Sequence, residues 1–207
     1  MRPLLLTLLS LMTAYAAPIK VACVGDSITQ GVGARSGQSY PAQLQALLGA
    51  GYEVGNFGVS GRTLLKKGDF PYWQEKKYQA ALAMEPAIVI IMLGTNDTKP
   101  QNWKHEAEFV ADYRELVKSF QSLASRPKVF VCRPVPVPGQ GNFGINEENV
   151  RKEIPRIDAL AQELGCGVID MHAALEKFPE MLPDRVHPNT AGAGEMAKAA
   201  AQAILGK

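Results

Sequence analysis

The sequence predicts a single three-layer α/β/α sandwich built on a five-stranded parallel sheet. Short apolar runs alternate with amphipathic stretches from Ile19 to the end of the chain, and this alternation is typical of parallel strands joined by helices. Several runs, such as Val21 to Val24 and Ile88 to Leu93, are apolar at every position. Strands have this composition when helices cover both faces of the sheet.

The five expected strands are short and lie far apart in the chain. They span Ile19–Val24, Tyr52–Phe57, Ala87–Leu93, Lys128–Cys132 and Gly167–Ile169. In a doubly wound sheet, ligands bind at the carboxyl ends of the strands. The long connections 60–73 and 133–145 leave the predicted sheet at that edge, and Ser27 and Asn96 should share it.

The amphipathic stretches between the strands predict helices. They span Tyr40–Leu48, Gln74–Met84, Glu106–Ala124, Glu147–Leu164 and Ala191–Leu205. Ser39 stands before Tyr40 and Pro41, as a cap stands before a proline in the first turn. Asn146 is followed by two glutamates, which suit the positive end of a helix. Pro155 lies inside the fourth stretch and is expected to kink or split it.

Length and composition predict one globular domain with its own core. The chain has 207 residues, of which 46% are hydrophobic and 20% charged, without a repeat or an interdomain linker. Lys and Arg number 22 against 20 Asp and Glu, and they form no block that could follow a phosphate backbone. We therefore expect no nucleic-acid partner and no binding to a membrane surface. The oligomeric state stays open.

The first 16 residues have the pattern of a secretory signal peptide. Arg2 precedes the apolar run Pro3 to Met12, and Ala14-Tyr15-Ala16 has the small-x-small pattern of a cleavage site. A buried first helix or a short anchor is the alternative, but the run is too short to span a bilayer. We expect a mature domain over 17–207 that is exported to the periplasm or secreted, without stable membrane insertion after cleavage.

The three cysteines are not expected to form a disulfide framework. Cys23, Cys132 and Cys166 are an odd number and lie in or beside predicted strands. Buried free thiols are expected, and a bridge between Cys132 and Cys166 stays open.

The turn Gly25-Asp26-Ser27-Ile28-Thr29 follows directly on the first apolar run and carries a serine. A hydroxyl at this position can project from the carboxyl edge of the sheet, where backbone N–H groups point toward developing negative charge. The alternative is an ordinary strand-to-helix turn, in which Ser27 or Asp26 only caps a helix.

Three more segments resolve this choice. Asn56-Phe57-Gly58-Val59-Ser60-Gly61 follows the second strand, Gly94-Thr95-Asn96-Asp97 follows the third, and Asp184-Arg185-Val186-His187-Pro188-Asn189 lies near the end. With the Ser27 turn, this set resembles the SGNH hydrolases, also called the GDSL esterase and lipase family, over the whole mature chain. Ile28 replaces the leucine of the family name. The resemblance implies a flavodoxin-like sandwich and a carboxylic ester hydrolase.

The resemblance assigns a catalytic triad to Ser27, His187 and Asp184. A serine hydroxyl is a poor nucleophile unless a neighbouring base takes its proton. The His187 imidazole titrates near neutral pH, so it can accept this proton and pass it to the leaving group. Asp184 lies three residues before His187, so a short turn can bring its carboxylate to the other ring nitrogen.

The same resemblance assigns an oxyanion hole to three donors. Ser27 and Gly58 would offer backbone N–H groups, and Asn96 a side-chain amide. Removal of one such donor typically costs about 2.7–4 kcal/mol of transition-state stabilisation. Asn96 in isolation could equally be a turn residue.

The other polar residues near these segments have simpler interpretations. His172 follows Asp170 too closely to form a good dyad and is expected at the surface or in a cap, and His105 is expected to be solvated. Asp26 and Asp97 are expected to bond backbone amides of their own loops. No His, Cys, Asp or Glu cluster has metal-ligand spacing, so no metal and no other cofactor is expected.

The substrate is a glycan or small-molecule ester in the leading interpretation. Trp73 and Trp103 lie in connections at the predicted active edge, where they could stack on a sugar or line an acyl pocket; they could equally pack the loops onto the body. The pattern looks most like bacterial carbohydrate or sialate O-acetylesterases, which implies short acyl groups. A thioesterase, lysophospholipase or arylesterase with the same triad, and a non-catalytic glycan- or anion-binding module, are the alternatives.

Overall fold

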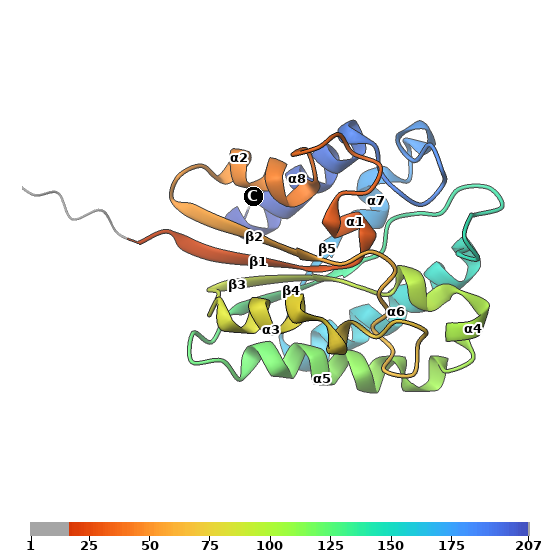
Figure 1. Cartoon of the computed structure of the whole chain (residues 1–207), viewed down its shortest axis with the longest axis horizontal. Coiled ribbons are helices and arrows are strands. Elements are labelled where there is room, and N and C mark those ends of the chain that lie inside the picture. The colour runs from red at the N-terminus through yellow and green to blue at the C-terminus, as the bar shows by residue number, and fades with distance from the viewer. Residues whose placement is uncertain (1–16, 207) are drawn as a thin grey trace, which may run out of the picture.

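The computed structural model describes residues 17–206, which form a parallel five-stranded sheet with helices on both faces (Figure 1). The strands are β1 (Ile19–Gly25), β2 (Tyr52–Gly58), β3 (Ile88–Met92), β4 (Lys128–Arg133) and β5 (Gly167–Asp170), in the order β2-β1-β3-β4-β5. The predicted fold class is confirmed. The signal peptide expected over residues 1–16 lies outside the described residues and stays a prediction.

The helices form one layer on each side of the sheet, as Figure 1 shows. Above it in that view lie α1 (Ser27–Gln30), α2 (Tyr40–Leu48), α7 (Met171–Leu175) and α8 (Thr190–Leu205). Below it lie α3 (Lys76–Ala83), α4 (Pro100–Trp103), α5 (Phe109–Gln121) and α6 (Glu147–Leu164). Four 3-10 helices lie in the connections: η1 (Tyr72–Gln74), η2 (Thr95–Thr98), η3 (Glu106–Glu108) and η4 (Pro179–Met181).

The central strands bury side chains on both faces. Ala22 and Val24 of β1 belong to the core beneath α3, α5 and α6, whereas Val21 and Cys23 belong to the core under α2, α7 and α8. Successive side chains of a strand point to opposite faces, so a strand between two helical layers must be apolar at every position. Full burial of one large apolar side chain contributes about 1.5–3 kcal/mol. The two cores together therefore explain the uninterrupted apolar runs.

The helix boundaries show where sequence patterns are informative. α2 and α6 begin and end as predicted, and Asn146 caps α6 by accepting the Asn149 N–H at 2.9 Å. Pro155 does not split α6, because the helix is packed on either side of it: Ile157 lies in the core below the sheet, and Val150 packs in a small apolar cluster with Val137, Ile145 and Val186. The four- and five-residue helices α1, α4 and α7 were not expected, since they are too short to show a helical period.

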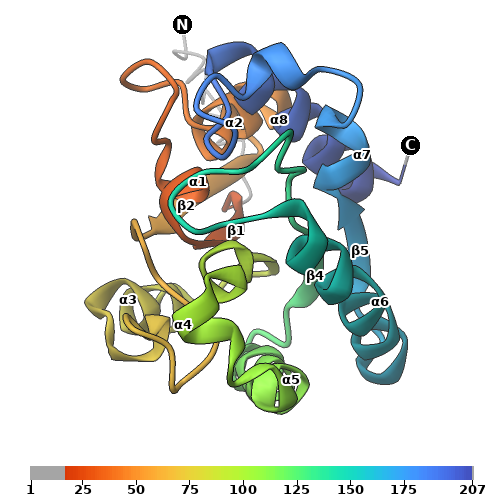
Figure 2. The same cartoon turned by 90° about the vertical axis from the view of Figure 1, so that its right-hand side faces the viewer.

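The register brings the ends of three strands to one edge. Gly25 at the end of β1 is paired with Gly58 of β2 and with Met92 of β3. Figure 2 looks onto this edge, where α1 and α4 lie and where the connection from β4 to α6 crosses in front of the sheet. Residues from distant parts of the sequence therefore meet here.

Two further expectations concern the cysteines and the membrane. Cys23 and Cys132 are buried free thiols, whereas Cys166 is free and only partly buried. Within residues 17–206, no helix has the length and apolar character needed to cross a membrane.

Candidate active site

Ser27 is held at the start of α1, directly after the sheet. Asp26 caps this helix, and its Oδ1 accepts the Ile28 N–H at 2.9 Å. Gly25 permits the tight exit from β1, because a Cβ there would lie 2.1 Å from Thr29 Oγ1 and 2.6 Å from the Met92 carbonyl oxygen. Ser27 is 5% exposed. The predicted nucleophile therefore lies at the carboxyl edge of the sheet on a rigid turn.

A chain of hydrogen bonds joins Ser27 to His187 and Asp184. Ser27 Oγ lies 2.9 Å from His187 Nε2, and His187 Nδ1 lies 2.7 Å from Asp184 Oδ2. An ionised carboxylate can only accept, so Nδ1 carries the hydrogen and neutral Nε2 accepts the Ser27 hydroxyl. The three side chains predicted as a triad thus meet in the order that proton transfer requires.

The Asp184 carboxylate is fixed by its own turn. Its Oδ1 accepts the Val186 N–H at 3.0 Å and the His187 N–H at 2.7 Å, which leaves Oδ2 for the imidazole. Partial burial raises the pKa of Asp184, but the hydrogen bonds from His187 and Val186 outweigh this effect and lower the pKa below its usual value. The carboxylate is therefore ionised at neutral pH.

Asn96 lies beside Ser27 at the end of β3. Gly94, with φ +128°, turns the chain into η2, and this turn carries Asn96 to the edge of the sheet. The Asn96 side-chain Nδ2 donates to the Arg62 carbonyl oxygen at 3.1 Å and lies 3.3 Å from Asp26 Oδ2. Both Asn96 and Ser27 line one pocket. The amide predicted as an oxyanion donor is thus next to the serine.

In the structure, Gly58 has a different role from the expected one. Its N–H donates to Asn56 Oδ1 at 2.9 Å, and a Cβ on Gly58 would lie 2.2 Å from the Gln30 backbone nitrogen. Gly58 therefore allows β2 to approach α1 closely, and it does not line the pocket that contains Ser27. This corrects the expectation that its N–H faces the substrate.

Gly61 takes the position expected of Gly58. It lines the pocket with Ser27 and has φ +80°, a conformation that favours glycine. Among residues 17–206, neither its N–H nor that of Ser27 has a hydrogen-bond partner. Gly61 belongs to the same segment as Gly58, residues 56–61. Its position after Ser60, in a turn beyond the end of β2, could have identified it as the candidate oxyanion donor. The two backbone N–H groups are free to bind an anionic oxygen.

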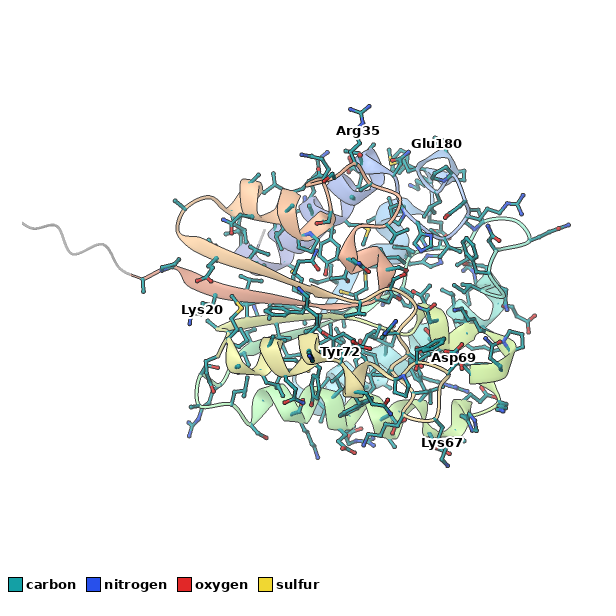
Figure 3. All side chains as sticks on the ribbon, viewed as in Figure 1. Lys20, Arg35, Lys67, Asp69, Tyr72 and Glu180 are labelled. Carbon is teal, nitrogen blue, oxygen red and sulfur yellow. The ribbon has the colours of Figure 1, made fainter. Side chains whose placement is uncertain are left out.

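The pocket over Ser27 is small. Its volume is about 240 Å³, and it is lined by Ser27, Ser60, Gly61, Asn96, Lys99, Phe143, Ile145 and His187. A larger groove of about 720 Å³ lies between the turn after α1 and helix α8, but none of these residues lines it. Arg35 on the wall of that groove is labelled at the outer side of the upper layer in Figure 3. The smaller pocket is the candidate site, because Ser27 and His187 meet there, a possible nucleophile and its base.

The connection between β4 and α6 forms one wall of this pocket. Asn142 Nδ2 donates to the Asp184 carbonyl oxygen at 3.0 Å, and Arg185 Nη1 donates to the Gly141 carbonyl oxygen at 3.3 Å. These bonds hold the connection against the turn that bears His187. The Phe143 ring then lies 5.7 Å from the imidazole, measured between ring centroids. Sequence reasoning did not single out Phe143, because a phenylalanine in a glycine-rich connection has no motif.

The two tryptophans lie away from the pocket, which corrects the expectation that they contact substrate. Trp73 Nε1 donates to the Leu64 carbonyl oxygen at 2.8 Å, and its ring packs edge-on against Tyr78. Trp103 is 8% exposed and packs on Phe109. Both belong to the layer below the sheet, in which Tyr72 is labelled in Figure 3. Burial of their large apolar surfaces outweighs any advantage of exposing them.

Two buried aspartates lie beneath the pocket. Burial raises the pKa of Asp26 to about 6 and that of Asp97 to about 7, despite hydrogen bonds from backbone N–H groups. Asp26 bonds within its own turn as expected, whereas Asp97 accepts the N–H groups of Leu64 and Leu65 in another connection. Asp97 thus fixes the path of the chain that leads away from Gly61.

His172 is buried, which contradicts the expected surface or capping role. Its Nε2 lies 2.8 Å from Glu147 Oε1, and the side chain is 7% exposed. Within residues 17–206, no group of three or more His, Cys, Asp or Glu side chains is arranged to hold a metal ion.

Comparisons with known proteins identify the family of the chain. The model of the GDSL-like Lipase/Acylhydrolase family matches residues 23–194. An acetylxylan esterase of Xylanibacter ruminicola is 41% identical over 207 residues. The match covers 90% of the chain but 43% of that protein, so the chain spans less than half of its relative.

Solved structures share the fold. A carbohydrate acetylesterase from Sinorhizobium meliloti superposes with a TM-score of 0.76 at 24% identity, covering 91% of this chain and 99% of that one. The inhibitor-bound M. smegmatis aryl esterase gives 0.75 at 22% identity with the same coverage. The expected resemblance is confirmed: the chain belongs to the GDSL-like lipase/acylhydrolase family of carboxylic ester hydrolases.

Proposed function

We propose that the protein is a serine esterase that removes short acyl groups, acetyl above all, from carbohydrates through an acyl-enzyme intermediate. The observation that carries this proposal is the continuous hydrogen-bonded series from Asp184 through His187 to Ser27, beside two backbone N–H groups without partners. A binding module would have no use for a base at 2.9 Å from a serine hydroxyl.

The first half of the reaction forms the acyl-enzyme. Ser27 Oγ attacks the acyl carbon of the ester while its proton passes to His187 Nε2. The tetrahedral intermediate then collapses, the bond between the acyl carbon and the alcohol oxygen breaks, and His187 returns the proton to the leaving alkoxide. Asp184 stabilises the imidazolium that exists between these two transfers.

The second half releases the acid. A water molecule takes the place of the alcohol, His187 Nε2 accepts its proton, and the hydroxide attacks the acyl carbon bound to Ser27. Collapse of the second tetrahedral intermediate breaks the ester bond to Oγ, which recovers its proton from His187. The products are a free carboxylic acid and the original enzyme.

Three donors stabilise the oxyanion in both halves. They are the N–H groups of Ser27 and Gly61 and the Asn96 side-chain amide, so Gly61 replaces Gly58 in the assignment. The contact of Asn96 Nδ2 with Asp26 is the longer of its two, at 3.3 Å against 3.1 Å to the Arg62 carbonyl oxygen, so it is the contact that a bound oxyanion would replace. Each donor is expected to contribute about 2.7–4 kcal/mol to transition-state binding.

The size of the pocket favours a short acyl group. At about 240 Å³ it is below the roughly 300–1,000 Å³ typical of sites for drug-sized ligands, and Ile145 and Phe143 restrict it further. The named activities of the acetylxylan esterase and of the carbohydrate acetylesterase support acetyl as the acyl group and a carbohydrate as the carrier. With the signal peptide expected over residues 1–16, we propose that the enzyme acts after export.

The test is a substrate panel with two inactivated variants. The purified protein is assayed on 4-nitrophenyl acetate, butyrate and octanoate, on acetylated xylo-oligosaccharides, and on acetyl thioesters and lysophospholipids. We expect acetyl carriers to be hydrolysed fastest, and Ser27→Ala and His187→Ala to be inactive while their circular dichroism matches the parent. Faster turnover of octanoate would overturn the acetyl assignment, and full activity of either variant would overturn the mechanism.

A further inference from the structure

Lys99 is the charged side chain among those that form the wall of the Ser27 pocket. It is half-buried, and within residues 17–206 its ammonium forms no ion pair or hydrogen bond. A cation that is partly removed from water without a partner is unfavourable unless a ligand supplies one. The pocket therefore contains an unused positive charge.

The position of Lys99 is fixed by the fold. It caps α4, and its carbonyl oxygen accepts the N–H groups of Asn102 at 2.9 Å and Trp103 at 2.8 Å. Its side-chain stem packs beside Gly144, with Cγ 3.7 Å from the point where a Cβ of that glycine would lie. Lys99 is thus held between η2 and the connection that bears Phe143.

The surrounding charges leave the mouth of the pocket positive. Asp26, beneath the pocket, is fully buried; burial raises its pKa to about 6, and the positive charge of Lys99 offsets only part of that rise. Asp184 is engaged by His187 and by its own turn. The guanidinium of Arg62 pairs with Glu75 at 2.7 Å. None of the pocket-lining side chains among the described residues is a carboxylate.

Phe143 adds a flat apolar surface on the same side. Its side chain is 56% exposed even though it is large and hydrophobic, and its backbone has φ +53°, a strained value for a phenylalanine. Strain of this kind persists only where the surroundings impose it, and it is common at ligand-binding sites. An aromatic face of this kind is suited to pack against a sugar ring.

We propose that the alcohol part of the natural ester is an acidic sugar, in which a carboxylate binds Lys99 and the ring lies against Phe143. The proposal rests on the esterase function argued above and names the carrier of the acyl group. An O-acetylated uronic acid residue has the required chemistry: an ester for Ser27, a sugar ring for Phe143 and a carboxylate for Lys99.

The test compares two substrates that differ only in charge. O-acetylated methyl glucuronoside is assayed beside its carboxamide, which has the same shape without the negative charge, by release of acetate. We expect the parent enzyme to prefer the acid by about tenfold in kcat/KM, mainly through KM, as a charge-assisted hydrogen bond of moderate strength predicts. The preference should weaken as salt is added.

Three substitutions assign this preference to one side chain. Lys99→Met should abolish the ratio between acid and carboxamide, and Lys99→Arg should retain most of it. Lys104→Met is the matched control, because it removes an equal charge from an exposed position outside the pocket, and its ratio should equal that of the parent. If Lys99→Met misfolds, competitive inhibition of the parent by glucuronate, and none by glucose, gives an independent measure.

Two results would overturn the proposal. The parent enzyme would show no preference for the acid over the carboxamide, or Lys99→Met would lower activity on both substrates equally, which would mean that Lys99 acts on the oxyanion and not on the carrier. Failure of the esterase function itself is a separate result, in which 4-nitrophenyl acetate is not hydrolysed at all.

Discussion

Two histidine–carboxylate pairs lie near the carboxyl edge of the sheet, with nearly the same distance between partners, although the carboxylate meets Nδ1 in one and Nε2 in the other. His187 is 2.7 Å from Asp184, and His172 is 2.8 Å from Glu147. The difference lies at the other ring nitrogen. His187 Nε2 meets the Ser27 hydroxyl in a pocket, whereas the second nitrogen of His172 has no hydrogen-bond partner among residues 17–206. A carboxylate beside a histidine is therefore not sufficient for a relay, which also needs a nucleophile that substrate can reach.

The His172 pair has a structural task instead. Glu147 is the first residue of α6, and its Oε2 accepts the Val137 N–H at 2.8 Å. Burial raises the pKa of Glu147, but the hydrogen bonds from His172 and Val137 outweigh this effect and hold the pKa below its usual value. The pair thus joins α7, α6 and the connection that carries Phe143.

The largest expected effect separates the two histidines by activity. His187→Ala should lower kcat/KM for an acetate ester by on the order of 10⁴-fold or more, because Ser27 loses its base. His172→Gln should change the same quantity by a few-fold at most. Initial rates with 4-nitrophenyl acetate measure both. Equal losses in the two variants would break the comparison.

The next largest effect is expected from replacing Asp184, the carboxylate that is hydrogen-bonded to His187. Asp184→Asn keeps the shape of the turn but presents the imidazole with the wrong hydrogen-bonding partner, so we expect a loss of roughly 10³–10⁴ in kcat. Glu147→Gln is the matched change in the other pair and should leave kcat close to the parent value. If Asp184→Asn had the kcat of the parent, His187 would not need this carboxylate to act as a base.

A substitution of Asn96 tests the oxyanion-binding pocket, which is present beside His187 and not beside His172. Asn96→Ala should lower kcat by about 10²–10³-fold, the typical effect of one oxyanion donor, with a smaller change in KM. The melting temperature should be compared in parallel, because this amide also bonds the Arg62 carbonyl oxygen. A loss confined to KM would mean that the amide binds substrate and not the transition state.

Stability should show the opposite ranking. His172→Ala removes a buried side chain and one of the hydrogen bonds to Glu147, although Glu147 Oε1 stays paired with Arg151 at 2.8 Å. The free energy of unfolding should therefore fall by about 1–3 kcal/mol. His187→Ala should cost less, since the His187 side chain is 13% exposed against 7% for His172, and Asp184 remains bonded to two backbone N–H groups. Urea denaturation of both variants ranks them, and a more destabilised His187→Ala would contradict the structural task assigned to His172.

The smallest expected effect is a pH dependence of the contribution that Glu147 makes to the free energy of unfolding. Because folding lowers the pKa of Glu147, its contribution is present above its unfolded pKa of about 4.3 and is lost as the pH falls through the folded value. The difference in unfolding free energy between the parent and Glu147→Gln should therefore shrink below about pH 4. A difference that stays constant from pH 7 to pH 3 would show that the carboxylate charge does not matter.

Much of the fold could be predicted because it depends on patterns that are local in sequence. All five strands were recognised, and the signal was clearest in the interior of the sheet, where burial on both faces leaves an uninterrupted apolar run such as Ile88 to Met92. The three residues expected to form the relay meet in space for a similar reason: Ser27 lies in the turn that follows one such run, and Asp184 and His187 share one short turn.

The features that could not be predicted from the sequence depend on packing between distant segments of the chain. Gly58 and Gly61 stand three residues apart, and only the approach of α1 shows that the first is needed for packing while the second faces the pocket. Trp73 and Trp103 were placed at the correct edge, but the core below the sheet takes up both rings. The Glu147 partner of His172 is 25 residues away, so spacing alone gave no sign of it.

Covalent labelling of Ser27 is the most direct measurement of the central claim that His187, and not His172, activates the serine. The protein is treated with a fluorophosphonate that reacts with activated serines, and the adduct is located by mass spectrometry of peptides. We predict one adduct, on Ser27, which forms at the parent rate in His172→Gln and is lost in His187→Ala. Labelling of Ser27 that persists in His187→Ala, or an adduct on another residue, would contradict it.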